Sequence, residues 1–90
     1  MDLPIKYSIS HWSIRKQARE EYVLRQKGKC YYCGGDLYVR PKQTKSINWK
    51  LFPPNFTKHP IHLHHCHETG LTLGAVHAYC NAVLWQYHGE

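Results

Sequence analysis

The chain has 90 residues and a formal net charge of +6, from 12 Lys and Arg against 6 Asp and Glu. A chain of this length buries little apolar surface, so its fold often depends on a metal ion or on disulfides. The positive charge favours a polyanionic partner, with nucleic acid the main candidate, because phosphate contacts release counterions. No apolar run approaches the roughly 20 residues of a membrane helix, and the N-terminal "MDLPIKYSISHW" lacks the long apolar centre of a secretory signal. We therefore expect a soluble cytoplasmic protein with no membrane partner, whose cysteines are metal ligands or free thiols.

A helix is predicted first, over about residues 12–26, because "SIRKQAREEYVLRQK" holds good helix formers and neither Gly nor Pro. Ser10 or Ser13 is the expected N-cap, and Gly28 is expected to end the helix. One narrow buried face is predicted from residues at four-residue steps, namely Ile14, Ala18 and Tyr22.

The next elements are short. Residues 29–40, "KCYYCGGDLYVR", suit a tight turn at Gly34 and Gly35 between short strands. Residues 41–60 lack periodicity and carry several prolines and lysines, which predicts a long basic surface loop. The alternating runs "IHLHH" and "LTLGAV", joined by "CHETG", predict a hairpin.

The chain is expected to close with a helix, "HAYCNAVLWQYH", which Gly89 terminates. Residues available for its packing are Ala78, Val83 or Ala82, and Trp85. Together the elements predict a small α+β fold in a single domain, residues 1–90.

Metal donors occur as two pairs with one spacing, Cys30 and Cys33, then His77 and Cys80. Two residues between donors let both side chains of a pair reach one ion, and a tetrahedral Zn²⁺ accepts thiolates and imidazole together. Such a site has no open position, so the zinc is predicted to be structural, and its removal is predicted to unfold the domain. Two alternatives stay open at this point. Cys66 could replace His77 as the fourth ligand, and the cysteines could be buried apolar residues or form disulfides.

Other residues of this region, His64, His65, His67 and Asn81, are not needed for zinc. With the donor pairs, the segments "CYYC", "LHHCHETG" and "GAVHAYCN" resemble, in order and spacing, the His-Asn-His (HNH) nucleases with a ββα-metal finger. The similarity spans about residues 29–85 and is to the branch of phage recombination endonuclease VII. It implies a zinc knuckle at 29–40 and a ββα-metal core at about 61–88, in a protein encoded by a phage in a bacterial host.

The resemblance also implies roles for side chains. His65 falls at the general base, and His64 and Asn81 fall at the ligands of a catalytic divalent ion. His64 stands where this branch has an aspartate, although other HNH nucleases carry a His-His pair in which the first histidine binds metal and the second is the base. His77 stands where this branch has a zinc cysteine, and it remains a competent zinc ligand. Because a neutral imidazole replaces a carboxylate, we expect the catalytic metal preference to shift from Mg²⁺ towards Mn²⁺ or another transition metal. His88, seven residues beyond Asn81 on the same helix face, is a candidate third ligand.

His64 and His65 are neighbours, so a regular strand would point them to opposite faces. Both reach one site only if the strand bends or bulges there. His67 is as compatible with a solvated turn as with a metal or phosphate contact, and no catalytic role is expected for His59 or His62.

The predicted function is a metal-dependent DNA endonuclease, in which imidazole takes a proton from water near neutral pH and a divalent ion stabilises the charge on phosphate. DNA is expected to be bound with weak or shape-based sequence preference, by Arg15, Lys16, Arg19, Lys42, Lys45, Trp49, Lys50, Phe56 and Lys58. A homodimer would suit a double-strand cut, although no heptad pattern predicts one. The alternative function is a non-catalytic zinc-binding DNA or protein interaction module on the same scaffold.

Overall fold

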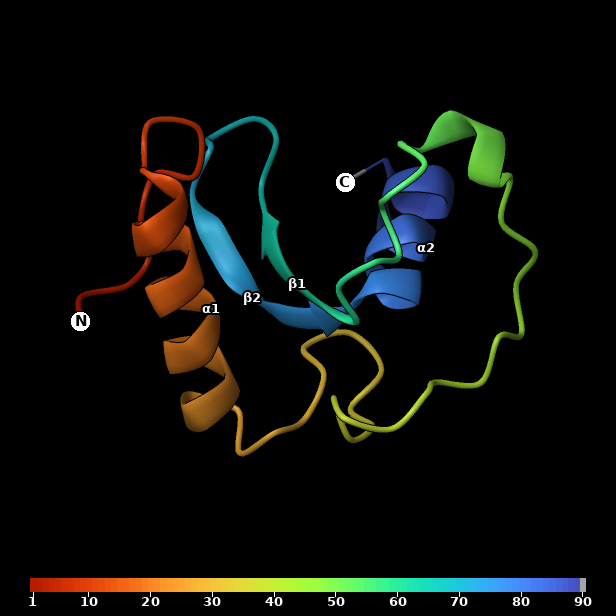
Figure 1. The fold of residues 1–90 in the computed structure, drawn as a ribbon, viewed down its shortest axis with the longest axis horizontal. Helices are drawn as coiled ribbons and strands as arrows, with labels where there is room; N and C mark the ends of the chain where they lie inside the picture. Colours follow the sequence, from red (N-terminus) through yellow and green to blue (C-terminus); the bar gives the residue numbers. More distant parts are fainter. Residues whose placement is uncertain (90) are drawn as a thin grey trace.

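The computed structural model describes residues 1–89 and contains two α-helices and one two-stranded antiparallel sheet. The elements in chain order are α1 (Trp12–Arg25), a short 3₁₀ helix (Trp49–Leu51), β1 (Ile61–His65), β2 (Thr72–His77) and α2 (Ala78–His88). The hairpin lies between the two helices, with α1 on one side and α2 on the other (Figure 1). The predicted α+β class is confirmed. Neither helix in this part of the chain has the length and apolar character needed to cross a membrane.

Helix α1 ends as predicted, but its N-cap is a different residue. His11 has an extended backbone, and its Nδ1 accepts a hydrogen bond from the Ser13 N–H at 3.2 Å. The Ser10 hydroxyl instead donates to the Lys6 carbonyl at 2.6 Å. The expectation of a serine cap was therefore wrong, because an imidazole nitrogen accepts the same first-turn hydrogen bond as a hydroxyl. Gly28, with a φ of 74°, turns the chain away after the helix as expected.

The hairpin contains an irregularity beside the adjacent histidines. Residues His64 and Gly74 pair, and the next pair is His65 with Thr72, so one extra residue of β2 lies between them. A bulge bends the strand that contains it and increases the local twist. The irregularity falls beside His64 and His65, but the extra residue belongs to β2 and not to their own strand.

The outer edge of β2 is covered by the segment that leaves α1. The Ala75 N–H donates to Gln26 Oε1 at 2.8 Å, and Gln26 Nε2 donates to the Ala75 carbonyl at 2.9 Å. A Cβ at Gly74 would lie 2.9 Å from both Gln26 Oε1 and the Tyr31 side chain. Because Gly74 has no side chain, the Gln26 amide can approach β2 and hydrogen-bond the N–H and carbonyl of Ala75. These two groups at the strand edge would otherwise lack a strand partner.

A small core joins the hairpin to α2 and to the segment 29–40, and it consists of Cys30, Leu37, Ala75, Val76, Tyr79, Cys80, Val83 and Leu84. Segment 29–40 forms a turn with one isolated bridge between Lys29 and Asp36, so the expected short strands are absent from it. The Gly34 N–H bonds the Cys30 carbonyl at 3.0 Å and closes the turn before a ladder can extend. Trp85, expected in the packing face of α2, is 44% exposed.

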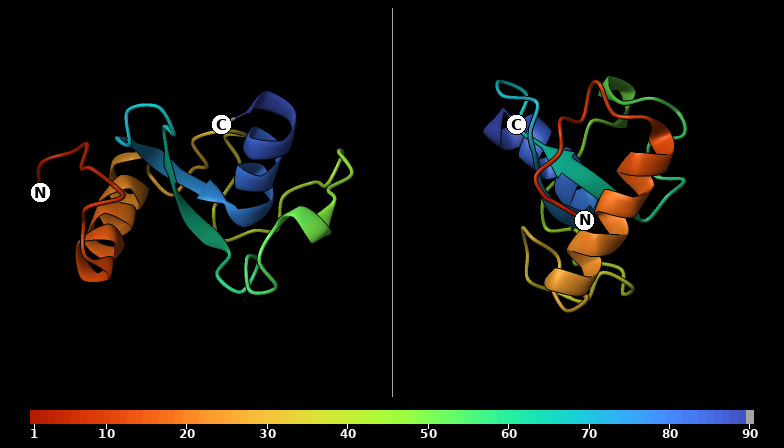
Figure 2. Two further views of the ribbon diagram at one scale, coloured as in Figure 1. Left: turned by 90° about the horizontal axis from the view of Figure 1, so that it is seen from above. Right: turned by 90° about the vertical axis from the view of Figure 1, so that its left-hand side faces the viewer.

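Residues 41–60 form the predicted long loop, whose first part passes α2 on the side away from α1 (Figures 1 and 2). After the 3₁₀ helix the chain returns between α2 and the hairpin (Figure 1). Helix α2 holds the loop through side-chain hydrogen bonds. The Tyr79 hydroxyl both donates to the Lys45 carbonyl and accepts from the Lys45 N–H, each at 2.7 Å. The Tyr87 hydroxyl donates to the Ser46 carbonyl at 2.6 Å. The loop is irregular in conformation but fixed in position.

Candidate functional site

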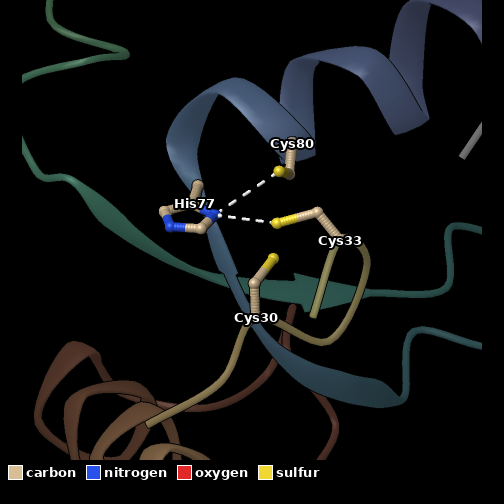
Figure 3. Close-up of side chains that lie close together, drawn as sticks. All are labelled: Cys30, Cys33, His77 and Cys80. Carbon is tan, nitrogen blue, oxygen red and sulfur yellow. Dashed lines mark hydrogen bonds between the residues drawn. The ribbon is translucent and has the colours of Figure 1, made fainter. Parts of the chain in front are cut away.

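The two predicted donor pairs meet at the junction of β2 and α2. The ligand atoms of Cys30, Cys33, His77 and Cys80 all lie within 4.8 Å of one another. Cys30 and Cys33 approach from the turn after α1, His77 from the end of β2 and Cys80 from the first turn of α2 (Figure 3). His77 Nδ1 is 3.5 Å from Sγ of both Cys33 and Cys80. Donors on a tetrahedral zinc ion lie roughly 3.5–3.8 Å apart, so these four residues could hold a zinc ion with little movement.

The hydrogen bonding of His77 supports this role. Its Nε2–H donates to the Asp36 carbonyl at 2.7 Å, which leaves the lone pair of Nδ1 facing the sulfur atoms. A second hydrogen bond of this kind fixes the tautomer and ring orientation of a metal-binding histidine. Cys66 is not in the cluster, because its backbone lies in the hairpin turn, where its N–H bonds the Leu71 carbonyl at 2.9 Å. His77 is therefore the fourth donor, and all four cysteines of the described chain are free of disulfides.

The cysteines of the cluster differ in acidity. A hydrogen bond from the Cys80 thiol lowers the pKa of Cys30, and the same hydrogen bond, with burial, raises the pKa of Cys80. The two thiols thus share one proton, and the pair offers a thiolate to a cation.

A second set of polar residues lines a pocket of about 870 Å³ that α1, the hairpin, residues 51–62 and α2 enclose. The three residues expected to be catalytic, His64, His65 and Asn81, all line it. Arg15, Lys16, Arg19 and Phe56 also line it, whereas the loop lysines expected to contact DNA do not. No Asp or Glu of residues 1–89 belongs to the lining. The pocket therefore suits an anionic ligand.

Asn81 connects two histidines at the floor of this pocket. His64 Nδ1 lies 3.2 Å from Asn81 Oδ1, and Asn81 Nδ2 lies 3.2 Å from His62 Nδ1. Adjacent ligands of an octahedral ion with bonds of about 2.1 Å lie roughly 3 Å apart. In this arrangement His64 Nδ1–H donates a hydrogen bond to Asn81 Oδ1, because an amide oxygen only accepts. The two atoms have the spacing of two ligands of one ion, which would bind in place of that proton.

No catalytic role was expected for His62, yet its ring contacts the amide of Asn81. Burial lowers the pKa of His62, which keeps the ring neutral and able to accept the Asn81 N–H. The sequence does hold a signal for this residue, because His62 and His64 are two apart in a strand and so share a face.

His65 lies beside this network, packed against the N-terminal segment. Its ring stacks on Tyr7 with centroids 4.0 Å apart and an interplanar angle of 8°. The Arg15 guanidinium lies 4.1 Å from the Tyr7 centroid, and the His67 ring lies 4.7 Å from that of His65. Burial lowers the pKa of His65, and the positive charges of His67, His64 and Arg15 lower it further. The ring is therefore kept neutral, which is the protonation state that a general base requires.

His88 is not brought to the pocket. Its Nε2 lies 3.2 Å from the Tyr32 hydroxyl, and its ring is exposed. Seven residues place His88 and Asn81 on one face of α2, but they also separate the two by about 10 Å along the axis. The structure thus does not group His88 with His64 and Asn81.

Two chemically different clusters consequently meet at the start of α2. Cys80 belongs to the Cys3His group, and the next residue, Asn81, belongs to the pocket. No protein-family model, no curated protein and no solved structure matches this chain.

Proposed function

We propose that the protein is a metal-dependent DNA endonuclease of the HNH type, which hydrolyses phosphodiester bonds. The observation that carries the proposal is the convergence of His64, His65 and Asn81 on one positively charged pocket. These are the residue types that a base and two metal ligands require, and both histidines line the same pocket.

In this proposal Cys30, Cys33, His77 and Cys80 hold a structural Zn²⁺. Three of the four are buried, and a full set of protein donors leaves no position for a substrate. The ion would tie the turn after α1 to the first turn of α2, and so hold Asn81 beside His64.

The reaction is assigned to the pocket residues. His65 takes the proton of the attacking water, in a ring that Tyr7 holds by stacking. Arg15, Lys16 and Arg19 attract the phosphate backbone. A divalent ion bound by His64 and Asn81 would supply positive charge for the phosphate and the leaving oxygen.

The donor set also favours one class of catalytic metal. Imidazole and amide donors are neutral, and no carboxylate of the described chain lines the pocket. Mg²⁺ is usually bound through carboxylates, whereas imidazole suits Mn²⁺, Co²⁺, Ni²⁺ and Zn²⁺ better. We expect cleavage to be faster with Mn²⁺, Co²⁺ or Ni²⁺ than with Mg²⁺.

Nicking of supercoiled plasmid by the zinc-loaded chain tests the proposal. The zinc-loaded parent should nick when a divalent ion is added and not when none is added, and His65→Ala should be at least about 100-fold slower. His88→Ala, which changes an exposed histidine outside the pocket, is the matched control and should nick at the parental rate. Equal zinc content in all three proteins shows that the fold is retained. Full cleavage by His65→Ala would refute the assignment of the base.

A non-catalytic zinc-binding module for DNA or protein is the competing function. It is favoured by the histidine at position 64, where the resemblance implies a carboxylate. Such a module would bind its partner but show no metal-dependent nicking in the parent protein under any of these ions.

A further inference from the structure

The pocket has an aromatic wall that the proposed chemistry does not use. Phe52, Phe56 and Trp85 form this wall, with the Phe52 ring 4.7 Å from that of Phe56 and 5.3 Å from that of Trp85. Trp85 is 44% exposed. Phe52 and Phe56 are half-buried, so the cluster is partly open to the pocket. Aromatic side chains that line a pocket and stay partly exposed are typical of a binding surface rather than of a core.

The aromatic wall is continuous with the proposed catalytic residues. The Phe56 ring meets the His62 ring edge to face at 4.6 Å, and His62 in turn contacts Asn81. A ligand on the wall would therefore reach directly to the candidate ion site.

The other side of the pocket is basic. Helix α1 contributes Arg15, Lys16 and Arg19, together with Trp12, which is 68% exposed. Helices α1 and α2 lie on opposite sides of the hairpin, so the basic helix and the aromatic wall flank the histidines from two directions (Figure 1).

We propose that this pocket binds single-stranded DNA, with the phosphates against α1 and the bases on the aromatic wall. The inference rests on the proposed function and names its substrate class. Proteins that bind single strands combine a positively charged groove with aromatic side chains on which bases stack. Within a duplex the flat faces of the bases are covered by neighbouring base pairs and cannot stack on Phe52, Phe56 or Trp85.

The size of the pocket agrees with this occupant. Its volume of about 870 Å³ falls in the range of roughly 300–1,000 Å³ that holds ligands of small-molecule size. Unpaired nucleotides can enter such a space, whereas a double helix can only rest on its rim. The strand would then place one phosphate between α1 and His65.

Fluorescence anisotropy of labelled oligonucleotides tests the inference with the zinc-loaded chain and no added divalent ion. The ligands are a single-stranded DNA of about 12 nucleotides, the same sequence as a duplex, and the same sequence as single-stranded RNA. We expect the DNA single strand to bind at least about tenfold more tightly than the duplex, because each stacked base adds to the affinity.

Variants of the aromatic wall locate the binding. Trp85→Ala should weaken single-strand binding by about 5- to 150-fold, and Trp85→Phe should restore most of it. Tyr38→Ala is the matched control, since Tyr38 is 74% exposed and does not line the pocket. Lys16→Ala changes an exposed position of α1. It should reduce the slope of log affinity against log salt concentration by the amount expected for about one phosphate contact. Zinc content and circular dichroism show whether each variant is folded.

Equal or tighter binding of the duplex would overturn the inference, as would unchanged single-strand affinity in folded Trp85→Ala. Tighter binding of RNA than of DNA would overturn the choice of DNA. Binding and cleavage are measured separately. A chain that binds single-stranded DNA but cleaves neither that strand nor plasmid, with any of the added divalent ions, refutes the nuclease alone. One that nicks plasmids but prefers duplex refutes this inference alone.

Discussion

Tyr7 connects the N-terminal segment to the candidate base, because its ring stacks on His65. The backbone N–H of Tyr7 donates to the Gly70 carbonyl at 2.8 Å, which attaches the segment to the hairpin turn. Stacked aromatic pairs contribute about 0.5–1.5 kcal/mol, so Tyr7→Ala should slow plasmid nicking by up to about tenfold. Tyr7→Phe keeps the ring and should nick at nearly the parental rate. If both variants were equally slow, the hydroxyl rather than the stack would be important.

Gly74 shows how one missing side chain sets the packing of a strand. A Cβ at this position would lie 2.9 Å from Gln26 Oε1 and from Tyr31 Cβ. Because overpacking of this kind costs about 1–3 kcal/mol, Gly74→Ala should lower the free energy of unfolding by that amount. Urea denaturation provides the measurement. Gly35→Ala is the control, since its Cβ would meet only Cys33 Sγ, at 3.5 Å, and a comparable loss there would argue against the packing explanation.

At the scale of the elements, the attachment of the long loop to α2 depends on the Tyr79 hydroxyl. Tyr79→Phe removes the partner of both the N–H and the carbonyl of Lys45. Lost hydrogen bonds of this kind cost about 1 kcal/mol or more, so the open form of the loop should become about 5-fold more populated.

Limited trypsin digestion measures this change, because the loop carries Lys42, Lys45 and Lys50. Cleavage in the loop should be about 5-fold faster in Tyr79→Phe than in the parent. Tyr38→Phe, at a largely exposed tyrosine, should be cut at the parental rate. Identical rates in all three proteins would show that other contacts hold the loop.

The elements predicted correctly are those with a strong local signal. Helix α1 lacks breakers, the hairpin alternates on both sides of a turn, and Gly89 ends α2 in a left-handed conformation. The failures occur where tertiary contacts decide. The turn at Cys30 closes too early for strands, His11 replaces a serine cap, and Trp85 faces a pocket rather than the core.

The candidate site was predictable in part for the same reason. Equal spacing identified the four residues that could hold a zinc ion, and the structure separates His77 from the alternative ligand Cys66 because only His77 lies in the cluster. The role of His62 depends on the position of Asn81 across the hairpin, and the Tyr7 stack depends on a segment far from it in sequence. Single-sequence patterns do not carry such long-range contacts.

At the scale of the whole molecule, we expect the fold to depend on metal binding by the Cys3His group, because the sheet has two strands and the core is small. Isolated two-stranded hairpins are marginally stable in water. A structural zinc contributes about 10–16 kcal/mol, which equals or exceeds the about 5–15 kcal/mol stability of a typical domain. Removing the metal should therefore unfold the chain.

Far-UV circular dichroism during titration with a strong chelator checks this expectation, and re-addition of Zn²⁺ should restore the signal. Cys80→Ser should lose both zinc and structure. Cys66→Ser changes a cysteine outside the cluster and should keep one zinc per chain. A circular dichroism spectrum of folded protein, from a sample shown to contain no zinc, would contradict the proposed stabilisation of the fold by zinc.

The 44-residue separation of Cys33 and His77 also orders events during synthesis. At about 5–20 residues per second, a ribosome makes the first thiol pair roughly 2–9 seconds before its partners. Asn81 is added directly after Cys80, the last donor. A growing chain would therefore complete the Cys3His group and the proposed catalytic set almost together.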